Sequence, residues 1–136
     1  MRVNPYLHFN GQCEAASKFY EKGLGGKIEA MIPHEGTLAA EYVPAEWRSK
    51  IMHACRVVDD QDLMGCDAPP DHFQKPRGFS VSIQIKKPAE AERIFGTLAE
   101  EGRLTMPIQE TFWAERFGMV VDRFGIPRMV NGEKAA

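Results

Sequence analysis

The stretch VNPYLHFNGQCEAASKFYEKGLGGKI, residues 3–28, recurs in altered form as FSVSIQIKKPAEAERIFGTLAEEGRL, residues 79–104. Four identical residues, all displaced by 76 positions without a gap, link the two stretches: Glu14 and Glu90, Ala15 and Ala91, Phe19 and Phe95, and Gly26 and Gly102. Each stretch reads as a short strand, a helix and a glycine-ended turn into a second strand. The sequence therefore predicts two copies of one small unit, with the active surface between them.

A second repeated motif, or echo, follows each stretch: Val57-Val58-Asp59 recurs 63 positions later as Val120-Val121-Asp122. The change from 76 to 63 implies 13 extra residues in the first copy, between Ile32 and Ile51. That segment, PHEGTLAAEYVPAEWRSK, contains prolines and charges and has no clean period. It is predicted to be a long loop on a rigid frame, where functional residues are often found.

The alternation of apolar and polar residues from Phe79 to Ile85 is typical of a strand with one face on the core. The odd-numbered residues, Phe79, Val81, Ile83 and Ile85, are expected to pack under a helix, and Ser80, Ser82 and Gln84 to face away. Applied to the first copy, the repeat places Val3, Pro5, Leu7 and Phe9 on the helix side and Asn4, Tyr6 and His8 on the other face. Two strands thus direct polar groups into one space.

Two helices are predicted, over Gln12–Leu24 and Pro88–Glu101, each ended by glycine. Further strands are expected near residues 26–32, 51–58, 61–66, 103–108, 116–122 and 126–131. Asp59-Asp60-Gln61 reads as a tight hairpin turn and Arg123-Phe124-Gly125 as its longer counterpart. The predicted fold is α+β, with the order strand, helix and three strands occurring twice, in units of about 3–67 and 78–131.

Composition limits the classes of function. A chain of 136 residues is expected to be a single domain, 1–136, that buries roughly two-thirds of its unfolded surface. The net charge of −2 and the scattered lysines and arginines argue against a nucleic-acid partner. No apolar run approaches the ~18 residues of a membrane-spanning helix, and no secretion signal precedes the first strand, so no membrane partner and a cytoplasmic location are expected. Cys13, Cys55 and Cys66 lack the paired spacing of a zinc or redox motif.

The tandem βαβββ units, FYEKGLGG after the first helix and DRFGIPRMVN at the last hairpin resemble the vicinal oxygen chelate superfamily of glyoxalases, bleomycin-resistance proteins and extradiol dioxygenases. PYLHFNG and QETFWAERFGMVVDRFGIP are similar to its PhnB-like branch, often labelled a 3-demethylubiquinone 3-methyltransferase domain. The resemblance spans residues 4–131. It implies that the strands curl into a half-open barrel around a cavity, commonly within a homodimer.

Enzymes of this superfamily bind a divalent metal through the first and last strands of each unit. Aligned with that pattern, the ligand positions fall at Asn4, Ser80, Met129, and either Met64 or Cys66. Amide, hydroxyl and thioether groups are poor ligands for iron, manganese or zinc. We therefore predict no catalytic metal, and no cofactor is predicted.

His8 faces the predicted cavity and is the best candidate for a catalytic proton acceptor, although it could simply bond to a neighbouring strand. Predicted ligand-binding residues are Tyr6, Ser82, Gln84, Met64 and Met129, together with Glu110, Phe112 and Trp113 in an aromatic segment that is either a pocket mouth or a dimer contact. Trp47 either closes over the opening or anchors its loop.

Other candidates favour structural interpretations. Cys66 could form a thiolate beside a cation but is better explained as a small buried side chain. His34 and His53 are expected to be structural or exposed, and His72 to be solvated. Gly23-Leu24-Gly25-Gly26 follows a helix, whereas a dinucleotide or S-adenosylmethionine fingerprint follows a strand, so these residues give the methyltransferase label no support.

The leading hypothesis is a metal-free protein that binds a small, partly apolar molecule in a cavity lined by both units. A metal-dependent enzyme of glyoxalase or dioxygenase type is one alternative. A drug- or metabolite-sequestering protein with an apolar groove is another, and a purely structural module is a third.

Overall fold

The computed structural model describes residues 1–134 and divides the chain into two compact units. Unit 1 spans Met1–Gln74 and unit 2 begins at Lys75. The elements of unit 1 are β1 (Tyr6–Phe9), α1 (Cys13–Leu24), β2 (Lys27–Pro33), β3 (Ile51–Val58) and β4 (Gln61–Asp67). Those of unit 2 are β5 (Val81–Ile85), α2 (Pro88–Ala99), β6 (Arg103–Gln109), β7 (Ala114–Val121) and β8 (Pro127–Glu133). The predicted order of strand, helix and three strands is therefore confirmed in both units.

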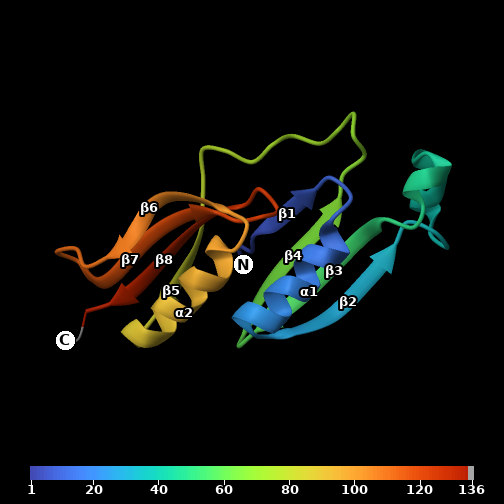
Figure 1. Ribbon diagram of the computed structural model, residues 1–136. Helices are drawn as coiled ribbons and strands as arrows, with labels where there is room; N and C mark the ends of the chain where they lie inside the picture. Colours follow the sequence, from blue (N-terminus) through green and yellow to red (C-terminus); the bar gives the residue numbers. More distant parts are fainter. Residues whose placement is uncertain (135–136) are drawn as a thin grey trace. The chain divides into compact units, whose positions relative to one another are not determined.

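Each unit forms one four-stranded sheet with one helix on one face (Figure 1). The strand orders correspond, β1-β4-β3-β2 in unit 1 and β5-β8-β7-β6 in unit 2. The first strand of each unit pairs in parallel with the last, and the other pairs are antiparallel. We call the sheet face opposite the helix the open face of each unit.

The apolar stripe of each helix forms the core of its unit. Ala91, Ile94, Phe95 and Leu98 of α2 are all buried, as predicted. Phe95 packs directly on Gly118 of β7. A Cβ added to Gly118 would lie 2.5 Å from Cε1 of Phe95. In unit 1, Tyr20 of α1 lies beneath the guanidinium of Arg56, whose Cζ is 5.7 Å from the ring centroid. A small residue in one sheet and a long one in the other thus accommodate the two helices.

The repeat extends through all four strands, but not at the offset that the sequence suggested. Gly26 and Gly102, 76 positions apart, approach the carbonyl oxygens of Val57 and Val121, which are 64 apart. Tyr6 pairs with Met64 and Ser82 with Met129, so the last strands correspond at an offset of 65. The Val-Val-Asp echo at 63 is therefore out of register, and unit 1 has 12 extra residues before β3, not 13. The longer β7–β8 turn of unit 2 accounts for the further change between the third and fourth strands.

Three face assignments from the sequence were wrong. Val3 is 90 % exposed and Phe79 is 55 % exposed, and Pro5 is also exposed, although all three were expected under a helix. The reason is that the strands begin only at Tyr6 and Val81, so the preceding residues lie outside the hydrogen-bonded sheet. Leu7, Phe9 and Ile85, further along the same strands, are buried as predicted.

The extra segment of unit 1 is not a plain loop, because it contains two short 3₁₀ helices, Leu38–Tyr42 and Ala45–Trp47. Thr37 caps the first of them by accepting a hydrogen bond from the Ala39 amide. The tight β3–β4 turn at Asp59 and Asp60 is confirmed, with Asp59 at a φ of 54°. None of the helices within residues 1–134 combines the length and apolarity needed to span a bilayer.

Candidate functional site

The open face of unit 1 carries a row of reactive side chains across three neighbouring strands. His8 of β1 pairs with Cys66 of β4. Because Ala54 pairs with Gly65 in the antiparallel β3–β4 ladder, the preceding residue, His53, stands beside Cys66. Tyr6 lies two residues before His8 and so shares this face. The sheet therefore gathers a tyrosine, two histidines and a cysteine.

Close contacts connect these four side chains. A hydrogen bond of 3.1 Å joins the Tyr6 hydroxyl to Nδ1 of His53, and Sγ of Cys66 lies 3.9 Å from Nδ1 of His8. The Tyr6 ring centroid is 5.5 Å from that of His8 and 5.8 Å from that of His53. Tyr6 is 40 % exposed and His8 is exposed, so a ligand on this face could reach both. We call these four residues the unit 1 cluster.

Burial raises the pKa values of the two acidic members of the unit 1 cluster, so both stay protonated well above neutral pH. It raises the pKa of the Tyr6 phenol to about 12, and the neighbouring Cys66 adds to this effect. Burial also raises the pKa of the Cys66 thiol, while the hydrogen bond with Tyr6 partly offsets the rise. Since a thiolate is the reactive form of cysteine, a nucleophilic role for Cys66 at neutral pH is disfavoured. The cluster offers a ligand two protonated donors and two imidazoles.

The open face of unit 2 carries a chain of amide and hydroxyl groups instead. Nδ2 of Asn131 donates to Oε1 of Gln84 at 2.8 Å, and Nε2 of Gln84 donates to Oγ of Ser82 at 2.9 Å. Because Ser82 accepts within this chain, its own hydroxyl proton can be donated to another group. The chain ends in a hydroxyl donor on the open face.

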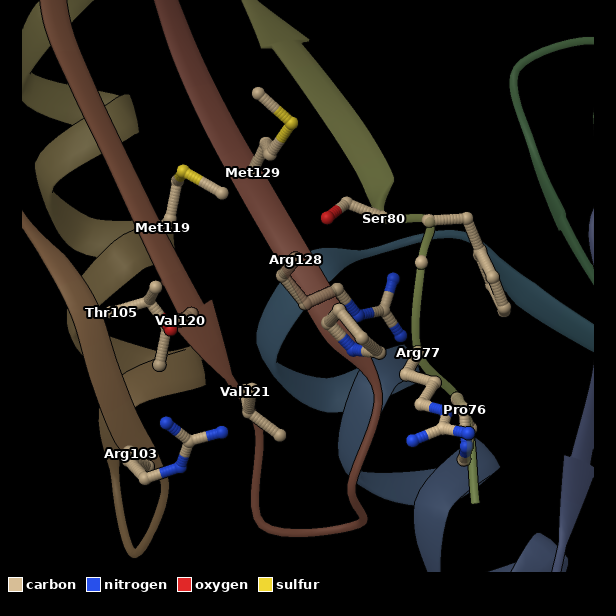
Figure 2. Close-up of a pocket in the computed structure, with 13 residues that line it drawn as sticks. Pro76, Arg77, Ser80, Arg103, Thr105, Met119, Val120, Val121, Arg128 and Met129 are labelled. Atoms are coloured by element: carbon tan, nitrogen blue, oxygen red, sulfur yellow. The ribbon is translucent and has the colours of Figure 1, made fainter. Parts of the chain in front are cut away.

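A pocket of about 570 Å³ lies in unit 2 beside this chain (Figure 2). Met119 and Met129 form part of its apolar wall, and Ser80 and Thr105 contribute hydroxyl groups. Its thirteen lining residues are Pro76, Arg77, Gly78, Phe79, Ser80, Arg103, Thr105, Met119, Val120, Val121, Pro127, Arg128 and Met129. Three of them are arginines and none is acidic.

The three arginines are held differently. Arg128 is 1 % exposed, and its Nε lies 3.2 Å from the buried carboxylate of Asp122. Arg77 and Arg103 are exposed, and neither forms an ion pair with any residue of the range 1–134. Figure 2 shows their guanidinium groups on opposite sides of Val121. The pocket therefore has a positive rim and an apolar wall.

The predicted ligand-binding residues fall into four groups. Tyr6 and His8 belong to the unit 1 cluster, and Met64 lies beside Tyr6. Ser82 and Gln84 belong to the hydrogen-bonded series of side chains in unit 2. Met129 lines the pocket. Glu110, Phe112 and Trp113 lie in the β6–β7 turn, and none of them lines that pocket. Phe112 is 87 % exposed and packs edge-on against Trp113, which in turn contacts Phe117, while Glu110 pairs with Lys134 at 3.5 Å.

Other histidines and Trp47 have local structural contacts. His34 is buried, and its Nδ1 lies 2.9 Å from the Lys50 carbonyl oxygen, as expected for a structural histidine. His72 is exposed, also as expected. The Trp47 ring lies against Gly11, where an added Cβ would be 3.3 Å from Cη2, so the ring anchors the extra segment within unit 1.

Sequence reasoning missed Asn131, Arg77 and Arg103, and it considered His53 without placing it beside Tyr6. The repeat compared the first strands of the two units. Asn131 lies on β8, which pairs with the first strand of unit 2, and His53 lies on β3, which is separated from β1 by β4. Once β3 is known to be a strand, its alternation assigns His53 to the open face, because the next residue, Ala54, is buried on the helix side. The arginines gave no local signal, since they are 26 residues apart in the sequence.

The residues at the superfamily's metal-ligand positions do not fit a catalytic metal. The strand register identifies Met64, not Cys66, as the counterpart of Met129. The donor set is then an amide at Asn4, a hydroxyl at Ser80 and two thioethers, with no carboxylate or imidazole. Within residues 1–134, no three His, Cys, Asp or Glu side chains are grouped to hold a metal ion. The absence of a catalytic metal remains a prediction.

Comparison with known proteins shows matches over nearly the whole chain. The family model described as 3-demethylubiquinone-9 3-methyltransferase matches residues 1–130. Protein YjdN of Escherichia coli strain K12 is 34 % identical over 139 residues, which cover 96 % of this chain and 95 % of that protein. The crystal structure of protein PA1353 from Pseudomonas aeruginosa is 44 % identical, with a TM-score of 0.90 and 99 % of each chain covered.

The fold extends to more distant proteins. A glyoxylase/bleomycin resistance protein/dioxygenase domain from Frankia sp. EAN1pec has a TM-score of 0.68 at 13 % identity, covering 98 % of each chain. At this identity the likeness concerns the fold alone. The predicted fold is confirmed, and the family match confirms the branch labelled as a 3-demethylubiquinone 3-methyltransferase domain.

Proposed function

The chain belongs to the 3-demethylubiquinone-9 3-methyltransferase family, and we propose that it binds a small molecule on the open faces of its sheets without a catalytic metal. The family description does not extend to a methyl-donor site. Gly25 and Gly26 follow the end of α1 and lead into β2, whereas a nucleotide-type glycine loop follows a strand and opens a helix. The ligand-binding role rests instead on the side chains of the open faces.

The unit 1 cluster carries the proposal. Polar groups with a purely structural role are usually buried and hydrogen-bonded. Here four side chains capable of hydrogen bonding or proton transfer lie together on the sheet face that no helix covers. Tyr6 and Cys66 remain protonated and can donate to a ligand, and His8 is placed to accept a proton. Such a face suits a ligand with hydrogen-bond acceptors and, if a reaction occurs, an acidic C–H or O–H group.

Thermal stabilisation by a panel of metabolites and metal ions tests the proposal, because a molecule that binds only the folded protein raises the Tm. We expect at least one organic ligand to stabilise the protein after treatment with a chelator. Tyr6→Phe and His8→Ala should reduce that stabilisation or any associated turnover, and His72→Ala, at an exposed histidine of the connector, is the matched control. Purified protein with stoichiometric iron, manganese, nickel or zinc that the ligand requires would contradict the metal-free proposal.

The same variants separate catalysis from sequestration. If His8 accepts a proton in a reaction, His8→Ala should lower turnover by about 10²-fold or more while ligand binding largely persists. If the protein only sequesters its ligand, no turnover accompanies binding and His8→Ala changes affinity alone. The pocket of unit 2, with its methionine wall, gives sequestration a physical basis.

A further inference from the structure

We propose that the pocket of unit 2 binds a small molecule that carries an oxyanion, either a carboxylate or a phosphonate, on an apolar body. This inference rests on the proposed ligand-binding function and specifies the chemical class of the ligand. It follows from the arrangement of charge, apolar surface and hydroxyl groups around one pocket.

The charge around the pocket is opposite to that of the whole chain. The chain as a whole has a net charge of −2, yet the pocket is lined by three arginines and no carboxylate. Arg128 is balanced by Asp122, which leaves Arg77 and Arg103 as the cations available to a ligand. Guanidinium groups recognise carboxylate and phosphoryl groups through paired N–H donors. The rim therefore favours an anion in spite of the overall negative charge.

The apolar wall limits what the rest of the ligand can be. Met119 and Met129 lie side by side in the β7–β8 ladder, and Val121 and Pro127 form the next pair on the same face toward the turn. Methionine side chains adapt to irregular apolar groups and make favourable contacts with aromatic rings. A bare inorganic anion would leave this surface uncovered, so an aromatic or branched apolar body fits better.

Hydroxyl groups complete the recognition surface. Ser80 lines the pocket immediately before β5, and Ser82 follows two residues later with its hydroxyl proton available. Ser82 pairs with Met129, so the end of the hydrogen-bonded chain adjoins the apolar wall. These donors match the acceptor-only character of an ionised carboxylate or phosphonate.

The pair of arginines beside an apolar wall occurs in unit 2 and not at the corresponding positions of unit 1. The positions 76 residues before Arg77 and Arg103 are Met1 and Lys27, and those that correspond to Met119 and Met129 are Cys55 and Met64. Unit 1 therefore repeats the fold of this region but not its pair of arginines. Anion recognition is thus a property of individual residues rather than of the repeated framework.

The test compares three probes of nearly the same shape: phenylacetate, benzylphosphonate and the neutral phenylacetamide. Binding is followed by NMR titration of ¹⁵N-labelled protein at low ionic strength. We expect at least one anion to bind about tenfold or more tightly than the amide, with shifts centred on Met119 and Met129. The two anions distinguish carboxylate from phosphonate as the preferred group.

Variants locate the anion. Arg77→Gln combined with Arg103→Gln should weaken binding of the preferred anion by about tenfold and leave the amide unchanged. Arg93→Gln, at an exposed arginine of α2 that does not line the pocket, is the matched control. Added salt should weaken anion binding in the wild type more than in the double variant.

Two results would overturn this inference. Equal binding of the acid and the amide would show a pocket that selects shape but not charge, and would leave the proposed ligand-binding function standing. Binding of neither anion at millimolar concentration would also reject the oxyanion class, while the metabolite panel would still decide independently whether the protein binds small molecules.

Discussion

The two units share a framework but stabilise it with different buried charges. In unit 1, the carboxylate of Asp67 accepts hydrogen bonds from the amide of Cys13 at 2.8 Å and from that of Ile51 at 2.9 Å. It thereby ties the end of β4 to the start of α1 and to β3. The strand register places Gly132 at the corresponding position of unit 2, which has no side chain to do this.

The buried carboxylate of unit 2 belongs instead to Asp122, which follows the end of β7. Asp122 accepts from the amides of Phe124 and Ile126 and pairs with Arg128, so it organises the β7–β8 turn. The buried arginine of unit 1, Arg56, instead donates to the Gly25 carbonyl oxygen at 2.7 Å and lies over Tyr20. Equivalent folds therefore do not require equivalent polar interactions.

Each unit also contains one tryptophan, Trp47 in unit 1 and Trp113 in unit 2. Trp113→Phe therefore leaves a fluorescence probe of unit 1, and Trp47→Phe leaves a probe of unit 2. Urea unfolding of these two backgrounds measures the stability of each unit separately.

The largest effect is expected for Asp122→Ala. The substitution leaves the buried guanidinium of Arg128 without its carboxylate, which should lower the free energy of unfolding of unit 2 by about 3–5 kcal/mol. Adding Arg128→Met should recover part of the loss, because an apolar side chain has no charge to bury. An equal loss of unfolding free energy in the transitions reported by Trp47 and by Trp113 would contradict the assignment of this effect to unit 2.

Asp67→Ala should have the next largest effect, about 3 kcal/mol, through the loss of two charge-assisted hydrogen bonds and exposure of two buried amides to an apolar gap. The Trp47 transition should shift to lower urea concentration more than the Trp113 transition. Asp71→Ala, in the exposed connector, should leave both transitions unchanged. A similar shift from Asp71→Ala would remove the special role of Asp67.

Glycine substitutions test the corrected register. An added Cβ would lie 2.5 Å from the Val57 carbonyl oxygen at Gly26 and 2.6 Å from the Val121 oxygen at Gly102. Each glycine-to-alanine change should cost about 2 kcal/mol, and Gly26→Ala more than Gly102→Ala because Gly26 has a φ of 84°. Gly96→Ala is the control, since a Cβ there meets no atom within 4 Å. Two neutral substitutions would refute the offset of 64.

Alkaline pH should weaken unit 1 selectively, by about 1–2 kcal/mol near pH 10.5. All three cysteines and Tyr6 lie in unit 1, and burial raises the pKa of Cys13 from 9.0 to about 12. A thiol with a raised pKa in the folded state stabilises the fold fully below pH 9, and this contribution is lost as the pH rises from 9 toward 12. Cys13→Ala should flatten the pH dependence of the Trp47 transition; an unchanged slope would contradict this assignment.

Much of the candidate site could be anticipated from the sequence where the signal was local. Alternation along one strand placed Ser82 and Gln84 on the open face, and the repeat transferred that assignment to Tyr6 and His8. The same alternation failed at Val3 and Phe79 because periodicity does not show where strand pairing begins. The Val-Val-Asp echo failed for a related reason, since an identity between two copies does not establish which carbonyl faces which glycine.

By itself, the sequence determined the order of the elements, the buried stripes of the helices and the two polar strand faces, because these depend on periods of two or 3.6 residues within one segment. Only the tertiary structure brought His53 to Tyr6, joined Asn131 to Gln84, placed Asp67 at the start of α1 and gathered Arg77 and Arg103 at one pocket. These neighbours are set by the register between strands and by the path of turns. Such long-range pairings leave no periodic trace in the residues that make them.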